Sequence, residues 1–426
     1  MKLIVLALAL ILLKIPAAQA TFEDGQLAAR KGDYATAYKE FMILALESNI
    51  RAQHSVAVLY EQGLGRPKDF ALAVKWYTSA ARQGLEISQN NLGGMYRGGK
   101  GVRQDYAKAF NWFSKAAHQG HALAQKNLGD MYRKGLGVKK DKAAALKWYR
   151  ASSEQRQPWG QLSLGRLYQR GWGVKKDYAK AMKLYREAAK QNLALAQNNI
   201  GTLYRKGYGV RRNHLKAMKW FRKAAKQGHA LAQKNLGDMY RKGRGIKKDI
   251  AKSVKWYRAS ADKGEARGQL SLGRLYDQGR GVTKDKKKAF KWYSKAAIQG
   301  LPLAQNLLAN MYRRGTAVPK DDAKAVKWYR KAAKEGHAWS QFSLGRMYEQ
   351  GQGVAKDYGQ ALKWYRASAE QGEALGQFRL GSMYEKGAGA PKDAAKAVLW
   401  YRKAAAQGLE LAETALRKLK SQSTQK

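Results

Sequence analysis

The chain has 426 residues, with 82 Lys and Arg against 31 Asp and Glu and no Cys, so its formal net charge is +51. Its apolar fraction of 45% and aromatic fraction of 11% are too high for a disordered polycation, so the charge must decorate a packed structure. The lack of Cys excludes disulfides, thiolate zinc sites and thiol nucleophiles.

Residues 1–20 have the pattern of a secretory signal peptide. A positive start precedes an apolar run from Leu3 to Leu13, and Ala18 and Ala20 supply the small residues of a cleavage site. An uncleaved membrane anchor is the alternative, but the run is much shorter than the roughly 20 residues that cross a bilayer. We expect cleavage after Ala20 and a periplasmic or secreted bacterial protein.

The rest of the chain is dominated by an internal repeat of 36 residues. We expect a degenerate N-terminal capping repeat at 21–48, ten repeats over 49–408, and a C-terminal capping helix and tail at 409–426. The repeat is marked by a tyrosine column: Tyr60, Tyr96, Tyr132, Tyr168, Tyr204, Tyr240, Tyr276, Tyr312, Tyr348 and Tyr384.

Each repeat is predicted to form two helices. In the third repeat the helices run roughly over 122–133 and 142–153, separated by Gly135 and Gly137, which permit the positive φ of a sharp turn. Asp141 then stands where a helix N-cap belongs. The second helix places Trp148 and Tyr149 in one apolar sector, which a single helix pair cannot bury. Neighbouring pairs must therefore stack into an all-α solenoid.

A longer period, three repeats in length, lies on top of the shorter one. Residues 121–132 reappear unchanged at 229–240, and residues 161–168 reappear unchanged at 269–276. The array therefore looks like a block of three repeats that was copied about three times. This favours an extended surface with similar sites along it over one unique pocket.

The repeat motif resembles the Sel1-like repeat, a relative of the tetratricopeptide repeat. The resemblance rests on residues 124–141, Ala-Gln-Lys-Asn-Leu-Gly-Asp-Met-Tyr-Arg-Lys-Gly-Leu-Gly-Val-Lys-Lys-Asp, and on the Trp-Tyr pair that follows. It implies a right-handed α/α superhelix that acts as a protein-binding scaffold. A bacterial subgroup with a cysteine pair in each repeat is linked to β-lactam binding or hydrolysis, and the lack of Cys argues against that link here.

The positive charge follows the repeat. Fifteen residues after the column tyrosine, lysine occurs at Lys75, Lys147, Lys183, Lys219, Lys255, Lys291, Lys327 and Lys363. Most repeats also carry Lys twelve residues and Arg eighteen residues after that tyrosine. These positions share one side of the second helix, so stacking predicts a basic ribbon, which either keeps the scaffold dissolved or recognises a polyanion.

In related superhelices the first helices line the concave groove, and we expect certain Asn and Arg side chains there to point away from the core and bind a ligand. Asn can pair with the backbone of an extended peptide, and Arg can hold a carboxylate with two bonds. Solvation of the groove is the alternative role. The candidates are Asn91, Asn127, Asn199, Asn235, Arg166, Arg274, Arg346, Arg133, Arg205, Arg241 and Arg313.

Other positions have simpler expected roles. A glutamine seven residues before each column tyrosine, from Gln53 to Gln377, is predicted to bond the backbone between repeats. Trp172, Tyr208 and Trp339 lie outside the aromatic columns and are candidate exposed contacts. No catalytic residue, metal site or cofactor is expected, since the sequence has no nucleophile-and-base pattern or phosphate loop.

The sequence therefore favours a non-enzymatic exported scaffold, expected to be monomeric, that binds a protein or peptide in its groove, the partner being acidic. The alternative is a polyanion-binding protein for acidic glycans or lipopolysaccharide, and a cell-wall or β-lactam hydrolase is less favoured. Nucleic acid is not an expected partner outside the cytoplasm.

Overall fold

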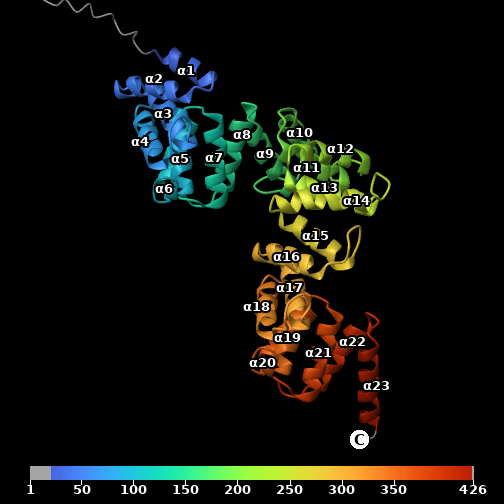
Figure 1. Ribbon diagram of the computed structural model, residues 1–426. Helices are drawn as coiled ribbons and strands as arrows, with labels where there is room; N and C mark the ends of the chain where they lie inside the picture. Colours follow the sequence, from blue (N-terminus) through green and yellow to red (C-terminus); the bar gives the residue numbers. More distant parts are fainter. Residues whose placement is uncertain (1–20, 425–426) are drawn as a thin grey trace, which may run out of the picture. The chain divides into compact units, whose positions relative to one another are not determined.

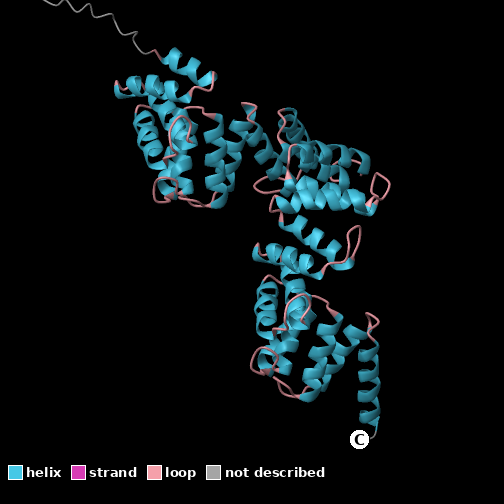
Figure 2. Cartoon of the chain, viewed as in Figure 1, coloured by secondary structure: helices cyan, strands magenta, loops and turns pink. Residues whose placement is uncertain are grey.

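The computed structural model describes residues 21–424, and the expected signal peptide lies outside the described residues. Within that range every regular element is an α-helix, joined to the next by a short turn (Figures 1 and 2). The predicted all-α array of helix pairs is confirmed. None of the helices in the described part is both long and apolar enough to cross a membrane.

The chain divides into two compact units. The first holds the described residues up to Ala196 together with Tyr208–Val210, and the second holds Gln197–Gly207 and the chain from Arg211 onward. The helices of the first unit are α1 (Phe22–Arg30), α2 (Tyr34–Leu46), α3 (Ile50–Gln62), α4 (Phe70–Arg82), α5 (Glu86–Gly98), α6 (Tyr106–His118), α7 (Ala122–Lys134), α8 (Lys142–Glu154), α9 (Pro158–Arg170) and α10 (Tyr178–Lys190).

Helix α11 (Ala194–Lys206) contains the boundary between the units. The helices of the second unit are α12 (His214–Lys226), α13 (Ala230–Lys242), α14 (Ile250–Asp262), α15 (Ala266–Gln278), α16 (Lys286–Ile298), α17 (Pro302–Arg314), α18 (Asp322–Lys334), α19 (Ala338–Gln350), α20 (Tyr358–Glu370), α21 (Ala374–Lys386), α22 (Ala394–Ala405) and α23 (Glu410–Thr424).

The turn within each repeat forms as its residues predict. Helix α7 ends at Gly135, which has a φ of 70° and donates its N–H to the Met131 carbonyl. Helix α8 then begins at Asp141, whose carboxylate accepts the Ala143 and Ala144 amides at 2.8 and 2.9 Å. These contacts satisfy amide groups that a helix terminus would otherwise leave unpaired.

The core of each repeat is built around the aromatic residue that follows the tryptophan. Tyr149 is 1% exposed, and its ring lies against Gly129, where an added Cβ would come within 2.8 Å of the ring. The tryptophans lie closer to the edge of the core: Trp328, for example, is half-buried, with the Lys331 ammonium 4.4 Å from its ring centroid. The second aromatic column is therefore the centre of the packing.

The glutamine column joins successive repeats, as predicted. Gln269 of α15 donates its amide to the Ala261 carbonyl of α14 at 3.3 Å. Gln299, which follows α16, donates in turn to the Gln269 side chain at 2.8 Å. The buried bond from Gln269 to Ala261 crosses from one helix pair to the next and fixes the register between repeats, and the bond from Gln299 holds the Gln269 side chain in place within its own pair.

Helix pairs and single helices also cover the ends of the array. Phe41 of α2 packs with Val56 and Leu59 of α3, so α1 and α2 continue the stack at its N-terminal end. At the other end Ala412 of α23 packs into the cluster that holds Tyr401 of α22. The last helix extends to Thr424, and the two residues after it lie outside the described range.

Candidate functional site

The first helices of neighbouring repeats lie side by side. Helix α7 contacts α9 in the first unit, and α13 contacts α15 in the second. In most repeats the tyrosine that follows the tryptophan column is buried, and its hydroxyl donates to a polar side chain on the first helix. We call these residues the second-column tyrosines. The hydroxyl acceptors are Glu61, Asp130, Gln169, Asp238, Asp277, Asn310, Glu349 and Glu385.

In the third repeat this contact becomes a network of charges. The Tyr149 hydroxyl donates to Asp130 Oδ1 at 2.5 Å and accepts from Arg133 Nε at 3.1 Å. Lys126 Nζ lies 2.9 Å from Asp130 Oδ2. Burial alone would raise the pKa of Asp130, but Lys126, the Tyr149 hydroxyl and Arg133 together lower it below its usual value. The carboxylate is therefore ionised and already paired.

The same network recurs three repeats later. Tyr257 donates to Asp238 at 2.6 Å and accepts from Arg241 at 3.1 Å, and Lys234 contacts Asp238 at 2.8 Å. Two repeats further on, Arg313 contacts the hydroxyl of Tyr329, which donates to Asn310. Arg133, Arg241 and Arg313 are therefore half-buried and bonded within their own repeats.

Where phenylalanine replaces the second-column tyrosine, the arginine after the column tyrosine lies over the phenylalanine ring because there is no hydroxyl to contact. Arg97 and Arg205 lie over the rings of Phe113 and Phe221, at 5.2 and 5.7 Å from the centroids. Each arginine then extends to the next first helix. Their Nη1 atoms lie 3.3 and 3.5 Å from the side-chain oxygens of Asn127 and Asn235 respectively.

Two of the candidate asparagines do not point away from the core. Asn127 and Asn235 are only 6% and 5% exposed, and they donate to Asn90 and Asn198 at 2.9 Å. The expectation of an exposed position was wrong because the residue five before the column tyrosine faces the preceding first helix in these repeats. They are bridges between repeats.

The other two asparagines, Asn91 and Asn199, are half-buried. Among the remaining arginines, Arg166 and Arg274 are exposed and Arg346 is half-buried. Arg346 Nε is buried without a hydrogen-bond partner among the described residues.

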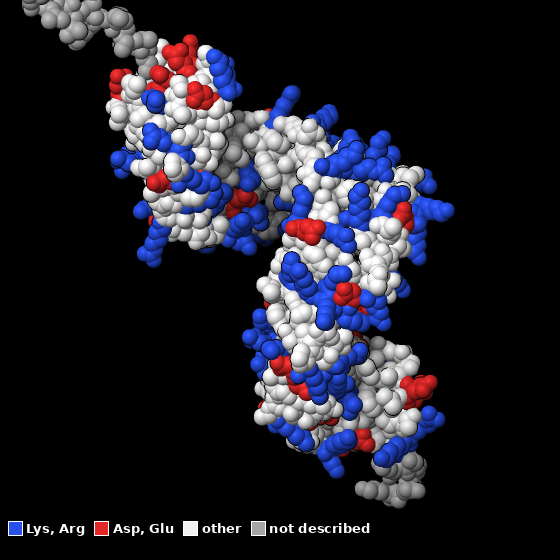
Figure 3. Space-filling view, viewed as in Figure 1, with Lys and Arg blue, Asp and Glu red and all other residues white. Residues whose placement is uncertain are grey.

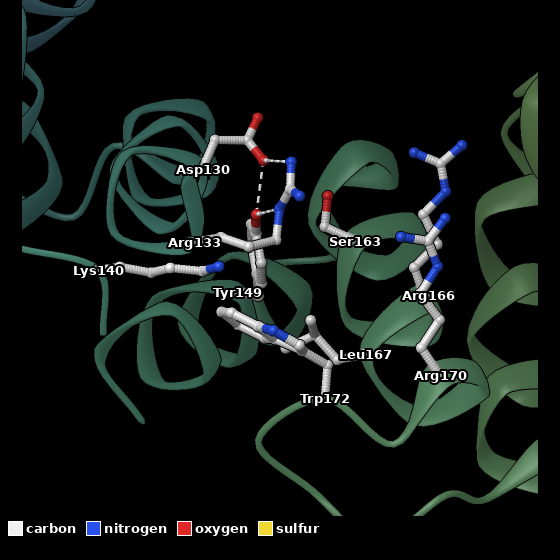
Figure 4. A pocket seen from close by; sticks show the side chains of 9 residues that line it. All are labelled: Asp130, Arg133, Lys140, Tyr149, Ser163, Arg166, Leu167, Arg170 and Trp172. Carbon is white, nitrogen blue, oxygen red and sulfur yellow. Dashed lines mark hydrogen bonds and ion pairs between the residues drawn. The ribbon is translucent and has the colours of Figure 1, made fainter. Parts of the chain in front are cut away.

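A cavity of about 370 Å³ opens between α7 and α9 of the first unit, and it brings together three of the predicted residues, Arg133, Arg166 and Trp172. Arg133 and Asp130 form one wall, Arg166 and Arg170 form the other, and the Trp172 ring lies at the end nearest the turn (Figure 4). Its lining residues are Asp130, Arg133, Lys140, Tyr149, Ser163, Arg166, Leu167, Arg170 and Trp172.

This cavity suits a carboxylate. Its one acidic group is already neutralised, whereas Lys140, Arg166 and Arg170 have no carboxylate partner among the described residues. Arg166 is exposed as a residue, but partial loss of water around its guanidinium lowers its pKa, and the charges of Arg170 and Arg133 lower it further. Such crowded guanidinium groups gain from an anionic guest, and Arg can hold a carboxylate with two parallel bonds.

Sequence reasoning placed Arg133, Arg166 and Trp172 among the candidates but missed Lys140 and Arg170. The repeat period could have identified both missed residues. Residues one repeat apart lie on adjacent turns of the solenoid, so Arg133 and Arg170 meet although they belong to successive repeats. The walls of this cavity come from two successive repeats, so the pattern within one repeat does not reveal it.

Many lysines of the second helices already have partners. Lys252 Nζ lies 3.0 Å from the capping Asp249 and 6.0 Å from the ring centroid of Tyr240, and most lysines at this position behave likewise. The eight lysines three residues further along are exposed and have no carboxylate partner within 21–424. On the visible face Lys and Arg cover more of the surface than Asp and Glu do (Figure 3).

Tandem helix pairs joined by glutamine side chains define a helical repeat scaffold. The comparisons with known proteins agree. The Sel1 repeat matches residues 50–85, 87–121, 122–156, 160–193, 194–229, 230–265, 266–301, 302–337, 340–373 and 374–409. The chain belongs to the Sel1 repeat family, as the sequence motifs predicted.

Two solved structures support this assignment. A protective antigen of uropathogenic Escherichia coli strains with an SLR fold is 36% identical, covering 91% of this chain and 90% of its own, with a TM-score of 0.46. A Sel1 repeat protein from Oxalobacter formigenes is 31% identical, covering 74% of this chain and 94% of its own, with a TM-score of 0.54. None of the curated proteins compared with the chain matches it.

Proposed function

We propose that this protein is a non-enzymatic, exported scaffold that binds an extended acidic segment of a partner protein. The observation that carries the proposal is the cavity between α7 and α9, where Lys140, Arg166 and Arg170 surround a space of about 370 Å³ and have no carboxylate partner among the described residues. An Asp or Glu side chain would complete these charges, and the Trp172 ring would pack against an apolar neighbour in the peptide.

Export is supported by the signal-like residues 1–20. It would place the scaffold among acidic proteins and anionic envelope components. Fractionation of cells that express the full chain tests it: the mature protein should begin at residue 21 and appear outside the cytoplasm. An uncleaved chain retained in the cytoplasm would contradict the proposal.

Binding is tested with selected peptides. A displayed random-peptide library is selected on the protein at elevated salt, and the enriched peptides are measured by fluorescence anisotropy. We expect acidic peptides whose affinity falls about tenfold in the variant R166Q/R170Q, since each lost bidentate pair is a charge-assisted contact. The control K75Q/K183Q removes the same charge from exposed second-helix positions and should change affinity less than about twofold.

Two results would count against groove binding. Peptides without acidic residues would contradict the chemistry of the cavity, and equal losses in both double variants would show that only net charge matters. The exposed lysine column favours the second candidate, a polyanion-binding protein. Heparin or lipopolysaccharide binding should then collapse steeply as salt rises, whereas selected peptides should remain bound.

The absence of an enzyme activity is part of the proposal. Cell-wall fragments and a β-lactam serve as substrates, and we expect no turnover above that of the buffer. Turnover by the purified protein that is retained after a second purification step would overturn the non-enzymatic assignment.

A further inference from the structure

The second unit contains a cavity with an entirely basic lining. It has a volume of about 510 Å³ and lies where the ends of α11 and α13 meet the turn that leads into α12. No carboxylate lines it among the described residues. Its lining residues are Arg205, Lys206, Arg212, His214, Lys242 and Arg244.

The scaffold does not require these six residues. The array copies itself every three repeats, so the same six positions can be read in the neighbouring copies. The earlier copy has Arg97, Gly98, Gln104, Tyr106, Lys134 and Leu136, and the later copy has Arg313, Arg314, Lys320, Asp322, Gln350 and Gln352. In the later copy Asp322 stands in place of His214 and pairs with Lys320 at 3.3 Å. A fully basic set is therefore particular to this copy.

Two nitrogen atoms in the cavity are buried and unpaired. Arg205 Nε and His214 Nδ1 have no hydrogen-bond partner among the described residues. The reason for the first is visible in the neighbouring repeats, where the equivalent Nε of Arg241 contacts the Tyr257 hydroxyl at 3.1 Å. Phe221 replaces that tyrosine beside Arg205 and has no hydroxyl. Buried polar groups are normally satisfied, so an unpaired Nε and Nδ1 indicate a missing partner.

The cations also repel one another. Burial lowers the pKa of Lys242, and Arg244 and Arg241 lower it further. Burial lowers the pKa of His214 as well, followed by the charges of Arg212, Arg244 and Arg205. The negative charge of Asp238 favours the charged form of Arg205, but the Asp238 carboxylate already contacts Lys234 and Tyr257. An added anion would relieve this repulsion.

We propose that this cavity binds a compact multivalent oxyanion of the phosphate class, either free or borne on a larger molecule. Arginine forks match the oxygens of phosphate, and His214 can donate through its ring nitrogen when it is protonated. His214 is also the first residue of α12, where helix amides favour an anion. Five permanent cations around the cavity suit an ion that carries several negative charges, such as pyrophosphate.

The test uses pyrophosphate as the probe and the full mature chain as the protein. Binding is measured by isothermal titration calorimetry at physiological salt. We expect one saturable site, and an affinity that falls about tenfold or more in the variant H214Y/R244L. Tyr and Leu occupy these two positions in the earlier copy, as Tyr106 and Leu136, so the variant should keep its fold, which circular dichroism checks.

A matched control separates the cavity from net charge. K219Q/R222Q removes two exposed cations from the same helix, α12, and should alter pyrophosphate affinity less than about twofold. The groove variant R166Q/R170Q should bind pyrophosphate normally, because this proposal does not depend on the peptide site. Absence of saturable binding, or equal losses in H214Y/R244L and K219Q/R222Q, would overturn the proposal.

A second arm identifies the source of the phosphate. Vesicles that contain phosphatidic acid are sedimented with the protein, with and without excess pyrophosphate. Vesicle binding that pyrophosphate displaces and that H214Y/R244L weakens would assign the site to a lipid-borne phosphate. Saturable pyrophosphate binding without vesicle binding would assign it to a free phosphate compound. Both outcomes support the oxyanion site, whereas vesicle binding unchanged in H214Y/R244L, together with no calorimetric signal, would refute it.

Discussion

Replacing Tyr149 with phenylalanine should weaken the network of Tyr149, Asp130 and Arg133 by a predictable amount. The hydroxyl donates to the ionised Asp130 at 2.5 Å and accepts from Arg133 at 3.1 Å, and the tyrosine is 1% exposed. A hydrogen bond to a charged group is worth about 1.5–3 kcal/mol, so Y149F should destabilise the third repeat by roughly 2 kcal/mol. The ring itself should remain packed, because Phe113 and Phe221 occupy the same column elsewhere.

The network can be isolated by a double-mutant cycle. The repeat that contains Phe221 has Thr202 where the third repeat has Asp130, so D130T is a substitution already present in the array. We expect Y149F to cost roughly 2 kcal/mol in the wild type but less than about 0.5 kcal/mol in the D130T background. The difference measures the coupling between the hydroxyl and the carboxylate.

Hydrogen exchange is the suitable assay, because a repeat array need not unfold as one cooperative unit. Amides in α7 and α8 should exchange roughly 30-fold faster in Y149F, while amides in α18 and α19 should not change. Equal costs of Y149F in both backgrounds would refute the reasoning, since the hydroxyl would then contribute nothing through Asp130.

The same network has a defined pH dependence. The pKa of Asp130 is lowered in the folded protein, so its ionisation stabilises the fold above the ordinary carboxyl value of 3.8. That contribution is lost as the pH falls below 3.8 through the lower native value. The energetic difference between wild type and D130T should therefore shrink over that range and stay constant above it.

Three further predictions follow from packing and charge. G93A should destabilise α5 by about 1–3 kcal/mol, because its Cβ would lie 2.9 Å from the Phe113 ring. The Cβ of G94A would meet no atom within 4 Å, so this variant should stabilise the helix by about 1 kcal/mol. Urea unfolding compares the two variants. The pKa of His214 should rise when pyrophosphate binds, because an anion among the five other cations favours the imidazolium; an NMR titration in which the ring resonances do not move would contradict this. The melting temperature should rise with added salt and rise further with heparin at matched ionic strength, and a flat response to both would refute self-repulsion along the lysine column.

The fold could be predicted because the residues that form the turns, the helix caps and the bonds between repeats recur in every repeat. Glycines that stop helices, aspartates that cap them and the glutamine that bonds the preceding repeat all act over short, fixed spacings. Asn127 was harder, because its burial depends on the angle at which one first helix meets the next. That angle is set by packing between repeats, where Asn127 meets Asn90 of the preceding first helix, and not by the helical face of Asn127 itself.

The binding residues could likewise be predicted only in part, because the cavities depend on contacts between repeats. Arg166 could be chosen from its helical position, but the cavity around it depends on Arg133, one repeat earlier. The basic cavity of the second unit is a sharper case, since Arg205 and Arg244 are ordinary charged residues when each repeat is read alone. Comparing copies three repeats apart reveals the one copy in which all six positions are basic. A basic residue at a single position is common in this chain, whereas six convergent basic residues without an acid are informative.

This comparison permits a gain-of-function test of the oxyanion site. The earlier copy already has Arg97 and Lys134 at two of the six positions. The missing cations are supplied by G98K, Q104R, Y106H and L136R. An added Cβ at Gly98 would approach only the Lys100 side chain, at 3.6 Å, so lysine should fit there. Q104R removes the bond from the Gln104 amide to the Arg97 carbonyl, at a cost of about 1 kcal/mol.

If the six basic residues are sufficient, the fourfold variant should bind two pyrophosphate ions per chain instead of one. The second site should have an affinity within about tenfold of the first, because Arg97 lies over Phe113 as Arg205 lies over Phe221. Combining the four substitutions with H214Y/R244L should leave only the new site. A folded fourfold variant that still binds one ion would show that these six residues are not sufficient for binding, even where an arginine lies over a phenylalanine ring as it does at Arg205.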